Sequence, residues 1–487
     1  MTTAVIILVL LGYFLLLIAV SLYTSRNADT QTFFNAHHSS AWYLVAYGMI
    51  GASLSGVTFI SVPGNVWQTA FAYLQMVFGY FLGYLVIAFV LLPLYYRLNV
   101  VSIYQYLRKR FGEYTYKTGA SFFLLSRTIG AAFRLYLMAS VLQFILFDAW
   151  HIPFFVTVLV TIFLIWVYTA KGGIKTVVYT DTLQTTFMLV SLAITMWSIS
   201  KAMGWDMQEM IQQVSQSKYA KIWFTEPGDT KFFLKYIISG MFITIVMTGL
   251  DQDMMQKNLT CKSLKDAQKN MLVFSIILIV VNLLFLTLGA LLYLYAEANH
   301  ITLEMLNNKT DLLFPHIALN GNLGITVGIF FLLGLIAAAY SSADSALTAL
   351  TTSACIDIIE VDKYPEQKKR SIKNKMHIVF SALLFVVIML FYLYNDDSVI
   401  TSLFKAAGFT YGPLLGMYAF GLFTKREVND KFVPIISILA PTLSLLLFFN
   451  AEELLGIKIG FEILLYNGLL TYIGLYFYHI KKQVHKY

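Results

Sequence analysis

The chain has 487 residues, of which 58% are hydrophobic and only 12% are charged, and its mean hydropathy is +0.70. Soluble globular proteins carry roughly 25% charged residues, so this composition excludes a soluble enzyme, a disordered chain and a nucleic-acid-binding module. The two cysteines, Cys261 and Cys355, offer neither a disulfide framework nor a CxxC metal site. The composition therefore indicates a protein that crosses a membrane many times.

A helix needs about 20 mostly apolar residues to cross the hydrocarbon core of a bilayer. About thirteen segments of the chain meet this condition, and we number them 0 to 12. They predict an all-α polytopic membrane protein in which residues 1–487 form a single transmembrane domain. In chain order the segments cover residues 4–22, 43–70, 73–98, 119–148, 152–170, 176–200, 232–256, 270–296, 316–357, 373–394, 399–422, 431–449 and 459–480.

The basic residues are distributed unevenly between the two sides of the predicted bundle. Cytoplasmic loops of membrane proteins are enriched in lysine and arginine. Here most basic residues, those of 257–269 included, follow the even-numbered segments, whereas the opposite loops hold few. We therefore expect a protein of the cell (inner) membrane with its amino terminus outside and its carboxyl terminus in the cytoplasm. The net charge of +8 mostly sets this orientation, and contact with anionic lipids is a secondary role.

Five ionisable residues inside the predicted spans stand out. Each costs about 2.5–3.5 kcal/mol near the centre of a membrane helix, so such residues are functional candidates by default. The alternative is that they reach an interface or pair with one another to hold the bundle together, and this is the simpler explanation for Lys405. The five are Arg127 and Arg134 in segment 3, Asp181 in segment 5, Asp344 in segment 8 and Lys405 in segment 10.

Asp344 lies in a stretch of small residues, AAAYSSADS at 337–345. Ser341 and Ser345 share its face of the helix, because side chains three and four residues apart stack on one side. Small residues also let two helices pack closely, which explains the alanines. Close packing does not explain a carboxylate.

Segment 1 contains residues that weaken a helix in mid-span. Gly51, Gly56 and a cluster of hydroxyl side chains are followed by Pro63, which has no amide donor. Free carbonyls are tolerated at membrane depth only where they are buried in protein or line a wet cavity, and in transporters they bind coupling cations. The alternative is a kink patched by serine and threonine. Segment 6 is interrupted at Gly240 and Gly249, so segments 1 and 6 would be equivalent in an inverted repeat.

Six short motifs follow one another along these spans: GASLSGVTF at 51–59, VSIYQYL at 101–107, YTDTLQ at 179–184, DQDMMQK at 251–257, SSADS at 341–345 and GPLLG at 412–416. With these motifs, nearly the whole chain resembles the sodium:solute symporter family, which includes bacterial proline, galactose and sialic acid transporters. The resemblance implies a LeuT-type core with broken helices 1 and 6, built from five-helix repeats at 43–200 and 232–422. The helix at 4–22 and the two carboxyl-terminal helices within 431–480 would lie outside this core.

The resemblance also implies a principal sodium site. Carried over by position, it would use the backbone carbonyls of Gly51, Leu54 and Ala338. The hydroxyls of Ser341 and Ser342 would complete it. A small hard cation needs several oxygen ligands, and a broken helix supplies carbonyls. Sodium is therefore the cofactor that we expect.

Some members of the family have a second sodium site, with an aspartate on helix 5 and serines on helix 8. Here Asp181 matches the aspartate, and Ser341 and Ser345 match two of the serines. Asp344 stands where the sialic acid transporter has a third serine. We expect a second sodium ion between Asp181 and Asp344, with Ser345 and Ser341 as further ligands. The alternatives are that an arginine of segment 3 neutralises the two carboxylates, or that one of them holds a proton.

The substrate contacts of the family on helix 1 match Ser53, Ser55 and Thr58. In the sialic acid transporter an arginine on helix 3 takes the substrate carboxylate. Arg127 and Arg134 lie on that helix, seven residues apart and on roughly one face, although they do not align cleanly with the family's arginine. A guanidinium fork suits a carboxylate, so we expect an anionic substrate. The same arginines could instead pair with the aspartates of segments 5 and 8.

These features predict a secondary active transporter, not an enzyme. It would couple inward sodium flux to the uptake of a small organic solute (a carboxylate, a sugar acid or a sugar) by alternating access. The alternative is a transporter-like membrane sensor that acts through a separate partner. The expected partners are the solute, sodium ions and membrane lipids, with neither nucleic acid nor an obligate protein partner.

Overall fold

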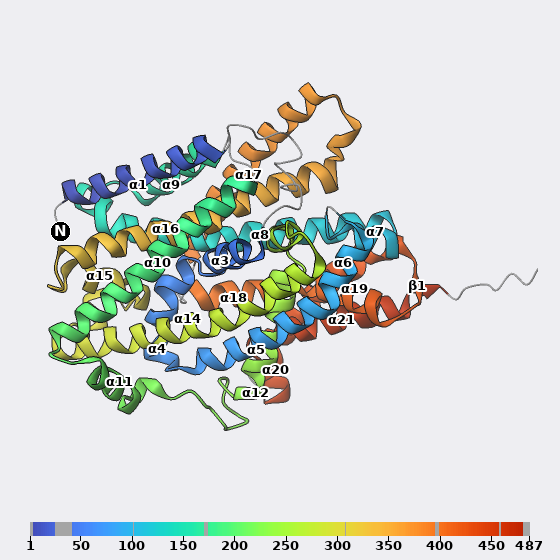
Figure 1. The fold of residues 1–487 in the computed structure, drawn as a ribbon. Coiled ribbons are helices and arrows are strands. Elements are labelled where there is room, and N and C mark those ends of the chain that lie inside the picture. Colours follow the sequence, from blue (N-terminus) through green and yellow to red (C-terminus); the bar gives the residue numbers. More distant parts are fainter. Residues whose placement is uncertain are drawn as a thin grey trace, which may run out of the picture.

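The computed structural model describes residues 3–24, 41–100, 102–169, 174–306, 308–394, 399–456 and 459–480, and within these ranges the chain is almost entirely helical. Seven of the described helices are long and apolar enough to cross a membrane. The bent pair Phe233–Gly249 and Gln252–Leu259 is a further candidate span. Figure 1 shows the long helices running side by side along one direction, as expected of a membrane bundle.

Short turns connect the helices, and several helices continue directly into a π-helical turn. The first half of the chain forms α1 (Thr3–Thr24), α3 (Trp42–Ser53), η2 (Val57–Ser61), α4 (Val62–Thr69), α5 (Ala72–Val86), η3 (Ile87–Leu91), α6 (Leu92–Leu98), α7 (Gln105–Arg110), α8 (Glu113–Leu142), η4 (Gln143–Phe147), α9 (Phe154–Thr169), α10 (Ile174–Ala202) and α11 (Met207–Gln216).

The second half of the chain is again helical, with one pair of short strands. Its helices are α12 (Phe233–Thr244), η7 (Ile245–Gly249), α13 (Gln252–Leu259), α14 (Leu264–Ala298), α15 (Leu313–Asn320), α16 (Ile325–Ser353), η10 (Ala354–Ile359), α17 (Glu366–Tyr394), α18 (Val399–Thr410), α19 (Gly412–Phe423), α20 (Val433–Leu455) and α21 (Ile463–Phe477). The strands β1 (Glu427–Val428) and β2 (His479–Ile480) pair antiparallel, with Glu427 opposite Ile480.

Each predicted segment contains at least one helix, but some predicted boundaries differ from the observed ones. The segment at 316–357 is divided, because α15 ends at Asn320 and α16 begins at Ile325. Gly324 precedes α16 with a φ of +95°, a backbone conformation that residues with a side chain rarely adopt. Apolar character averaged over a window cannot detect such a break.

The helix of segment 1 is interrupted near its middle. α3 ends at Ser53, Leu54 and Ser55 are not helical, and regular structure resumes in η2. Pro63 lies in the first turn of α4, which continues directly from η2. The interruption therefore falls between the two glycines of the motif, and the proline follows it, near the point where η2 continues into α4.

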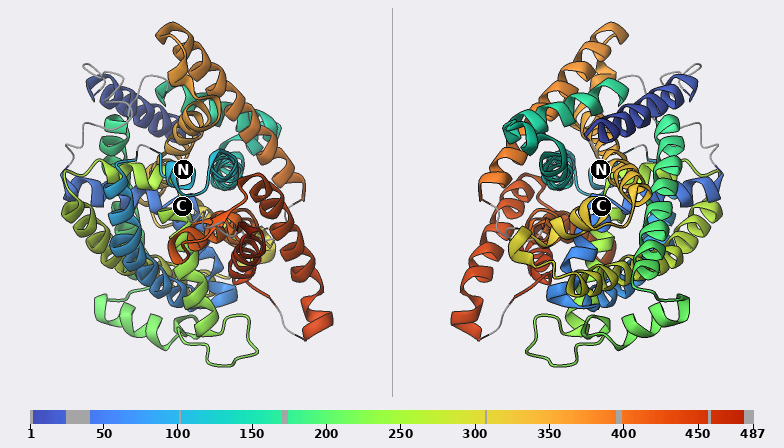
Figure 2. Two further views of the ribbon diagram at one scale, coloured as in Figure 1. Left: turned by 90° about the vertical axis from the view of Figure 1, so that its right-hand side faces the viewer. Right: turned by 90° about the vertical axis from the view of Figure 1, so that its left-hand side faces the viewer.

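Helices from the two halves of the chain pack against one another. α10 packs along α16, and both contact α3. α5 packs along α12, while α8 contacts α16, α17 and α18. Figure 2 views this arrangement end on, with helices of the first and second halves interleaved around the centre of the bundle.

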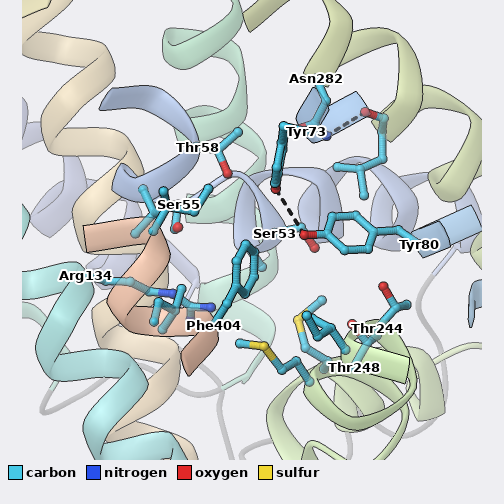
Figure 3. A pocket seen from close by; sticks show the side chains of 18 of the residues that line it. Ser53, Ser55, Thr58, Tyr73, Tyr80, Arg134, Thr244, Thr248, Asn282 and Phe404 are labelled. Carbon is cyan, nitrogen blue, oxygen red and sulfur yellow. Dashed lines mark hydrogen bonds between the residues drawn. The ribbon is translucent and has the colours of Figure 1, made fainter. Parts of the chain in front are cut away.

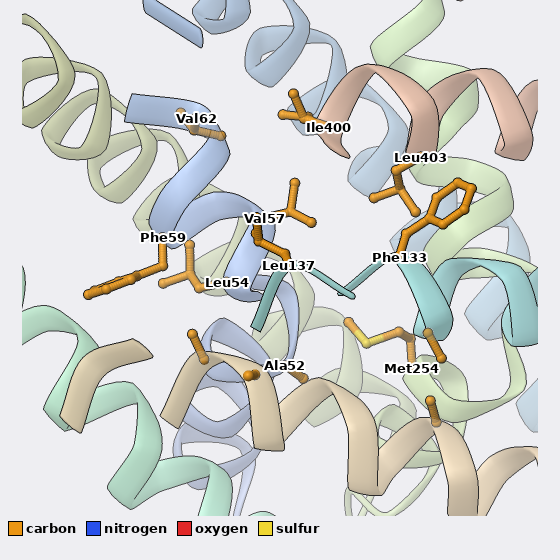
Figure 4. Close-up of a cluster of buried hydrophobic side chains, with 14 of the residues drawn as sticks. Ala52, Leu54, Val57, Phe59, Val62, Phe133, Leu137, Met254, Ile400 and Leu403 are labelled. Carbon is orange, nitrogen blue, oxygen red and sulfur yellow. The ribbon is translucent and has the colours of Figure 1, made fainter. Parts of the chain in front are cut away.

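Phe59 of η2 fixes the broken helix within this bundle. Its fully buried ring packs against Phe285 of α14, Phe314 of α15 and Phe331 of α16, at centroid distances of 6.0, 5.3 and 5.8 Å. Gly334 of α16 permits this approach, because a Cβ atom there would lie 2.7 Å from the Phe59 ring. Apolar side chains surround the break on this side, as Figure 4 shows for Leu54 and its neighbours.

Candidate functional site

The break after α3 places backbone groups without helical partners at the centre of the bundle. The Ser55 amide donates to the Ser53 carbonyl at 3.0 Å, and not to the Gly51 carbonyl four residues before it. Leu54 has a non-helical backbone (φ −78°, ψ 77°) and a fully buried side chain. α16 packs against α3 and η2, which flank the break. Carbonyl oxygens in this setting suit a bound cation.

The serine pair of α16 is buried next to this break. The Ser342 hydroxyl has no hydrogen-bond partner among the described residues. Ser341 donates to Asp181 Oδ1 at 2.6 Å, and Ala338, one turn earlier, is fully buried. A buried hydroxyl without a partner is costly, and a cation would remove that cost. The predicted sodium ligands thus come from two elements that touch, and their role stays a prediction.

Asp181 of α10 lies in a second buried polar cluster. Its Oδ1 accepts the hydrogen bond from Ser341, and its Oδ2 lies 3.0 Å from Lys257 Nζ. The same ammonium donates to Ser345 Oγ at 3.2 Å. The structure therefore brings together Asp181, Ser341 and Ser345, as the second sodium site requires, but with a lysine ammonium among them. The side chain of Asp344 lies outside the described part of the structure.

Arg127 of α8 is neutralised by two acidic residues near the start of α13. Its Nη2 lies 2.6 Å from Asp253 Oδ2, and its Nη1 lies 3.5 Å from Asp251 Oδ2. The Tyr411 hydroxyl also donates to Asp251 Oδ2, at 3.1 Å. All four side chains are buried. These partner carboxylates come from the segment 6 motif, which the sequence did not single out as a source of counter-charges.

A central cavity of about 100 Å³ lies beside the break. Figure 3 shows side chains from both sides of the bundle that point into it. Its polar and aromatic lining residues are Ser53, Ser55, Thr58, Tyr73, Tyr80, Tyr84, Arg127, Arg134, Thr244, Thr248, Asn282 and Phe404. The structure therefore collects all five predicted substrate residues in one place.

Arg134 differs from Arg127 in its partners. It lies two turns further along α8, and its guanidinium points into the cavity toward Phe404 (Figure 3). Its Nε is buried and has no hydrogen-bond partner among the described residues. No ion pair joins Arg134 to a carboxylate within the described ranges, whereas Arg127 has two. Within the described ranges, Arg134 is therefore a cavity-lining cation that no carboxylate neutralises.

A second cavity of about 260 Å³ lies beyond the central one. Tyr73, Ile400 and Phe404 line both cavities, and the rings of Tyr73 and Phe404 stack with centroids 6.5 Å apart. The Tyr73 hydroxyl also lies 3.2 Å from the Tyr80 hydroxyl. We call Tyr73, Ile400 and Phe404, which are two aromatic rings and one isoleucine, the aromatic layer. Lys405 lines the second cavity, on the far side of this layer from Arg134.

Lys257 is a buried, paired residue of the polar cluster at Asp181 that the sequence pattern concealed. The sequence assigns it to the basic cytoplasmic loop at 257–269, and this assignment is wrong, because its side chain is 2% exposed. The chain bends by 67° between Gly249 and Gln252, and α13 then packs against α3, α14 and α16. The available signal was the acidic pair at 251 and 253, which marks a charged segment inside the bundle.

A helical membrane bundle with a polar cavity at the break of a central helix is the architecture of a secondary transporter. The fold agrees with a solved Na⁺-coupled sialic acid symporter in a substrate-bound outward-open state. That similarity has a TM-score of 0.79 over 96% of each chain, at 19% identity. It shows the fold, which is of LeuT type as the sequence predicted.

The chain belongs to the sodium:solute symporter family, whose model matches residues 33–431. It is 23% identical over 444 residues to the sodium/sialic acid symporter NanT of Aliivibrio fischeri, covering 89% of this chain and 86% of that protein. It is 25% identical over 394 residues to the sodium-coupled monocarboxylate transporter 1 of Mus musculus, covering 78% of this chain and 62% of that protein.

Family membership confirms the predicted class of protein. The chain is an integral membrane transporter, not an enzyme, and it couples the movement of sodium to that of a small solute. The alternative of a membrane sensor is not needed to explain any part of the described structure. The identity of the solute and the individual ligands of solute and sodium remain to be assigned from the geometry.

Proposed function

We propose that this symporter carries a small organic anion whose carboxylate binds the guanidinium of Arg134. The observation that carries this proposal is the contrast between the two arginines of α8. Arg127 is neutralised by Asp251 and Asp253, whereas Arg134 reaches into the central cavity with no ion pair within the described ranges. An arginine fork can bind a carboxylate through two parallel hydrogen bonds, and an uncompensated buried cation is costly.

The dimensions and lining of the cavity favour a solute with few heavy atoms. Its volume of about 100 Å³ is below the roughly 300–1,000 Å³ of pockets that enclose drug-sized ligands. Hydroxyl groups of Ser53, Ser55 and Thr248 offer hydrogen bonds to a keto or hydroxyl group beside the carboxylate. A short carboxylate therefore suits the site better than a sugar acid or a neutral sugar. The two named relatives are described as carriers of sialic acid and of monocarboxylates, which are both carboxylates.

The coupling sodium ion is proposed to bind between the break and α16. Its ligands would be the carbonyls of Gly51, Leu54 and Ala338 and the hydroxyls of Ser341 and Ser342. The Gly51 carbonyl has lost its helical amide partner, and the Ser342 hydroxyl has no partner among the described residues. Both observations support a small hard cation, which binds several neutral oxygens at once.

The same break would couple the ion to the solute. Leu54 is a proposed sodium ligand, and its chain neighbours Ser53 and Ser55 line the solute cavity. An ion on the Leu54 carbonyl would fix the backbone that positions these two hydroxyls, so sodium binding would improve the solute site. A ligand can shift a conformational equilibrium only by its differential affinity for the two states, and here the ordered break supplies that difference.

The driving force of one sodium ion is adequate for uptake. A positive charge that crosses 100 mV gains about 2.3 kcal/mol. A tenfold sodium gradient adds about 1.4 kcal/mol. For a monovalent anion carried with one sodium ion the net charge movement is zero, so the sodium gradient alone would support roughly a tenfold solute ratio. Uptake of a neutral solute would use both contributions.

The orientation and the repeat organisation belong to the same proposal. The amino terminus would lie outside and the carboxyl terminus in the cytoplasm, with five-helix repeats at 43–200 and 232–422. α11 and α15 lie at one end of the bundle, and α7 and β1 lie at the other (Figure 1). This arrangement supports a common outer side for the loops at 201–231 and 297–315, which hold few of the basic residues.

A ligand screen tests the proposed solute class. Purified full-length protein is heated with short carboxylates such as acetate, lactate and pyruvate, with sialic acid, and with neutral sugars and amino acids, in sodium or in potassium. We expect a short carboxylate to raise the melting temperature in sodium but not in potassium. Stabilisation by a neutral sugar and by no carboxylate would contradict the role of Arg134. Uptake of the stabilising compound into proteoliposomes under a sodium gradient then measures transport directly.

A further inference from the structure

The ammonium of Lys257 lies inside a cluster of oxygen ligands contributed by two other helices. Lys257 belongs to α13, Asp181 to α10, and Ser341 and Ser345 to α16. Nζ lies 3.0 Å from Asp181 Oδ2 and 3.2 Å from Ser345 Oγ. The side chains of Lys257 and Asp181 are 2% and 0% exposed. Because both side chains are buried, bulk water screens this pair only weakly, and each charge depends on the other.

The oxygens of this cluster are those that a small cation would use. One carboxylate and two hydroxyls, on two helices that pack along each other, form a partly anionic oxygen set of the kind that binds hard cations. A primary ammonium carries a single positive charge, as a sodium ion does. Its three N–H groups can donate hydrogen bonds to the oxygens of the cluster. Lys257 therefore supplies the charge of a bound cation, but through a covalent attachment to α13.

α13 is held in position to deliver this ammonium. Asp251 accepts hydrogen bonds from the amides of Asp253 and Met254, at 3.0 and 3.3 Å, which caps the start of the helix. Arg127 of α8 pairs with Asp251 and Asp253. Lys257 lies one turn further on, where it reaches α10 and α16. The helix is thus fixed at one end to α8 and at the other to the pair formed by α10 and α16.

We propose that the ammonium of Lys257 is a built-in cation that takes the place of a second sodium ion between α10 and α16. The inference rests on the proposed function, because it assigns the remaining coupling ion to the site at Leu54 and Ser342. A sodium ion within bonding distance of Asp181 Oδ2 and Ser345 Oγ would overlap the ammonium and be repelled by it. The transporter would therefore bind one sodium ion in each cycle.

Ser341 connects this built-in cation with the sodium site. Its hydroxyl proton is directed to Asp181 Oδ1 at 2.6 Å, so its oxygen lone pairs remain directed elsewhere. The same oxygen is a proposed ligand of the coupling sodium. Lys257 fixes Asp181, Asp181 orients Ser341, and Ser341 would then present its oxygen to the sodium ion. Lys257 is in this sense a positioning residue for the ion that moves.

Direct sodium binding tests this inference without knowledge of the solute. Full-length protein in lipid nanodiscs is equilibrated with ²²Na⁺, and the bound ions per protein are counted across a sodium titration. We expect one saturable ion in the unaltered protein. Two ions would overturn the role of Lys257 while leaving sodium coupling intact. No bound sodium would instead remove the proposed sodium site itself, so the two failures are distinguishable.

Substitution of Lys257 should create the missing site. Lys257→Ala removes the ammonium and leaves space beside the Asp181 carboxylate, so the bound sodium should double. Lys257→Arg keeps the positive charge and should leave the count unchanged. The double variant Lys257→Met with Asp181→Asn removes both charges and should also bind a single ion. A count that stays at one in Lys257→Ala would mean that the pair only holds helices together.

Two further variants keep this test decisive. Lys257→Gln retains the length of the side chain and is measured if Lys257→Ala does not fold, with the same expected gain of a second ion. Lys235→Ala is the matched control, because Lys235 of α12 is a partly buried lysine paired with Glu462 at 3.8 Å, away from α10 and α16. A second ion in the Lys235 variant would show that loss of any lysine raises the count, and this would overturn the proposal.

Discussion

Two helices of this bundle are interrupted, one after α3 and one before α13, and different groups lie at the two interruptions. The break after α3 leaves a carbonyl at Gly51 without its helical amide, and serine hydroxyls line a cavity beside it. The bend before α13 is instead occupied by charged side chains, which form ion pairs with α8 and α10. An interruption with open oxygens suits a mobile ligand, whereas one filled with paired charges suits a fixed joint. The described structure therefore separates the proposed binding region from the anchored region, although both lie at interrupted helices.

Removal of Arg127 should have the largest effect on stability, because it acts on the anchored region. Arg127→Ala would leave two buried carboxylates, Asp251 and Asp253, without their cation, which costs about 3–5 kcal/mol. Chemical unfolding of purified protein in nanodiscs measures this loss. Lys235→Ala removes a partly exposed pair with Glu462 and should cost less than about 1 kcal/mol. Equal effects of the two substitutions would show that the bend is not anchored by Arg127.

Removal of Arg134, on the same helix, should reduce solute binding and leave stability nearly unchanged. Arg134→Ala removes a cation that no carboxylate neutralises in the described structure, so stability should change little. Affinity for the carboxylate solute should fall by about tenfold to hundredfold, the value of hydrogen bonds to a charged group. Arg134→Lys keeps the charge but loses the planar fork, and should also weaken solute binding while ²²Na⁺ binding is retained. Full uptake by Arg134→Ala would remove the main support for an anionic solute.

Loss of oxygen ligands beside the break after α3 should weaken sodium binding. The double substitution of Ser341 and Ser342 by alanine should raise the sodium concentration for half-maximal uptake by at least about tenfold, because two of roughly five ligands are lost. Ser342→Ala alone is the cleaner variant, since Ser341 also binds Asp181. Ser437→Ala in α20 is a matched control, because Ser437 is another buried serine without a partner among the described residues. Sodium dependence that is unchanged in the double variant would remove this site.

The smallest predicted effect concerns the aromatic layer beside the open break. Tyr73→Phe keeps the ring that stacks on Phe404 but loses the contact with the Tyr80 hydroxyl. Loss of one such hydrogen bond is worth about 0.5–1.5 kcal/mol, so release of labelled solute to the outer side should become roughly twofold to tenfold faster. Sodium affinity should not change. Slower release would indicate that the hydroxyl contact opens the layer and does not close it.

Local sequence chemistry predicted a helical membrane bundle and the break in segment 1, and the resemblance to a known family added the transporter class and the LeuT-type fold. Apolar runs predicted where helices occur, because the bilayer demands length and apolar character from each span. The glycines at 51 and 56 bracket the observed break, since glycine weakens a helix wherever it occurs. The division at Gly324 was missed because the flanking residues are apolar on both sides. Local composition therefore predicts which residues suit the lipid bilayer, but it does not predict every point at which the chain changes direction.

The pairing of buried charges could not be predicted in the same way. Arg127 finds its partners more than 100 positions away in the chain, at Asp251 and Asp253, and only the tertiary fold brings them together. Lys257 follows an apolar segment and precedes other lysines, so by sequence it belongs to a basic loop. The 67° bend before α13 moves it into the bundle. The second sodium ion at Asp181 stays a prediction, and Lys257 is now its competitor.

The aromatic layer has a consequence for the efficiency of energy conversion. Tyr73, Ile400 and Phe404 line both the central and the second cavity, so these three side chains form a wall that the two cavities share. A wall of three side chains opens with little motion, which favours rapid turnover. It also permits solute to escape backwards before the opposite side opens, and each such slip dissipates part of the sodium gradient without net accumulation. The steady-state ratio of solute inside to outside would therefore fall below the thermodynamic limit in proportion to how often these side chains separate.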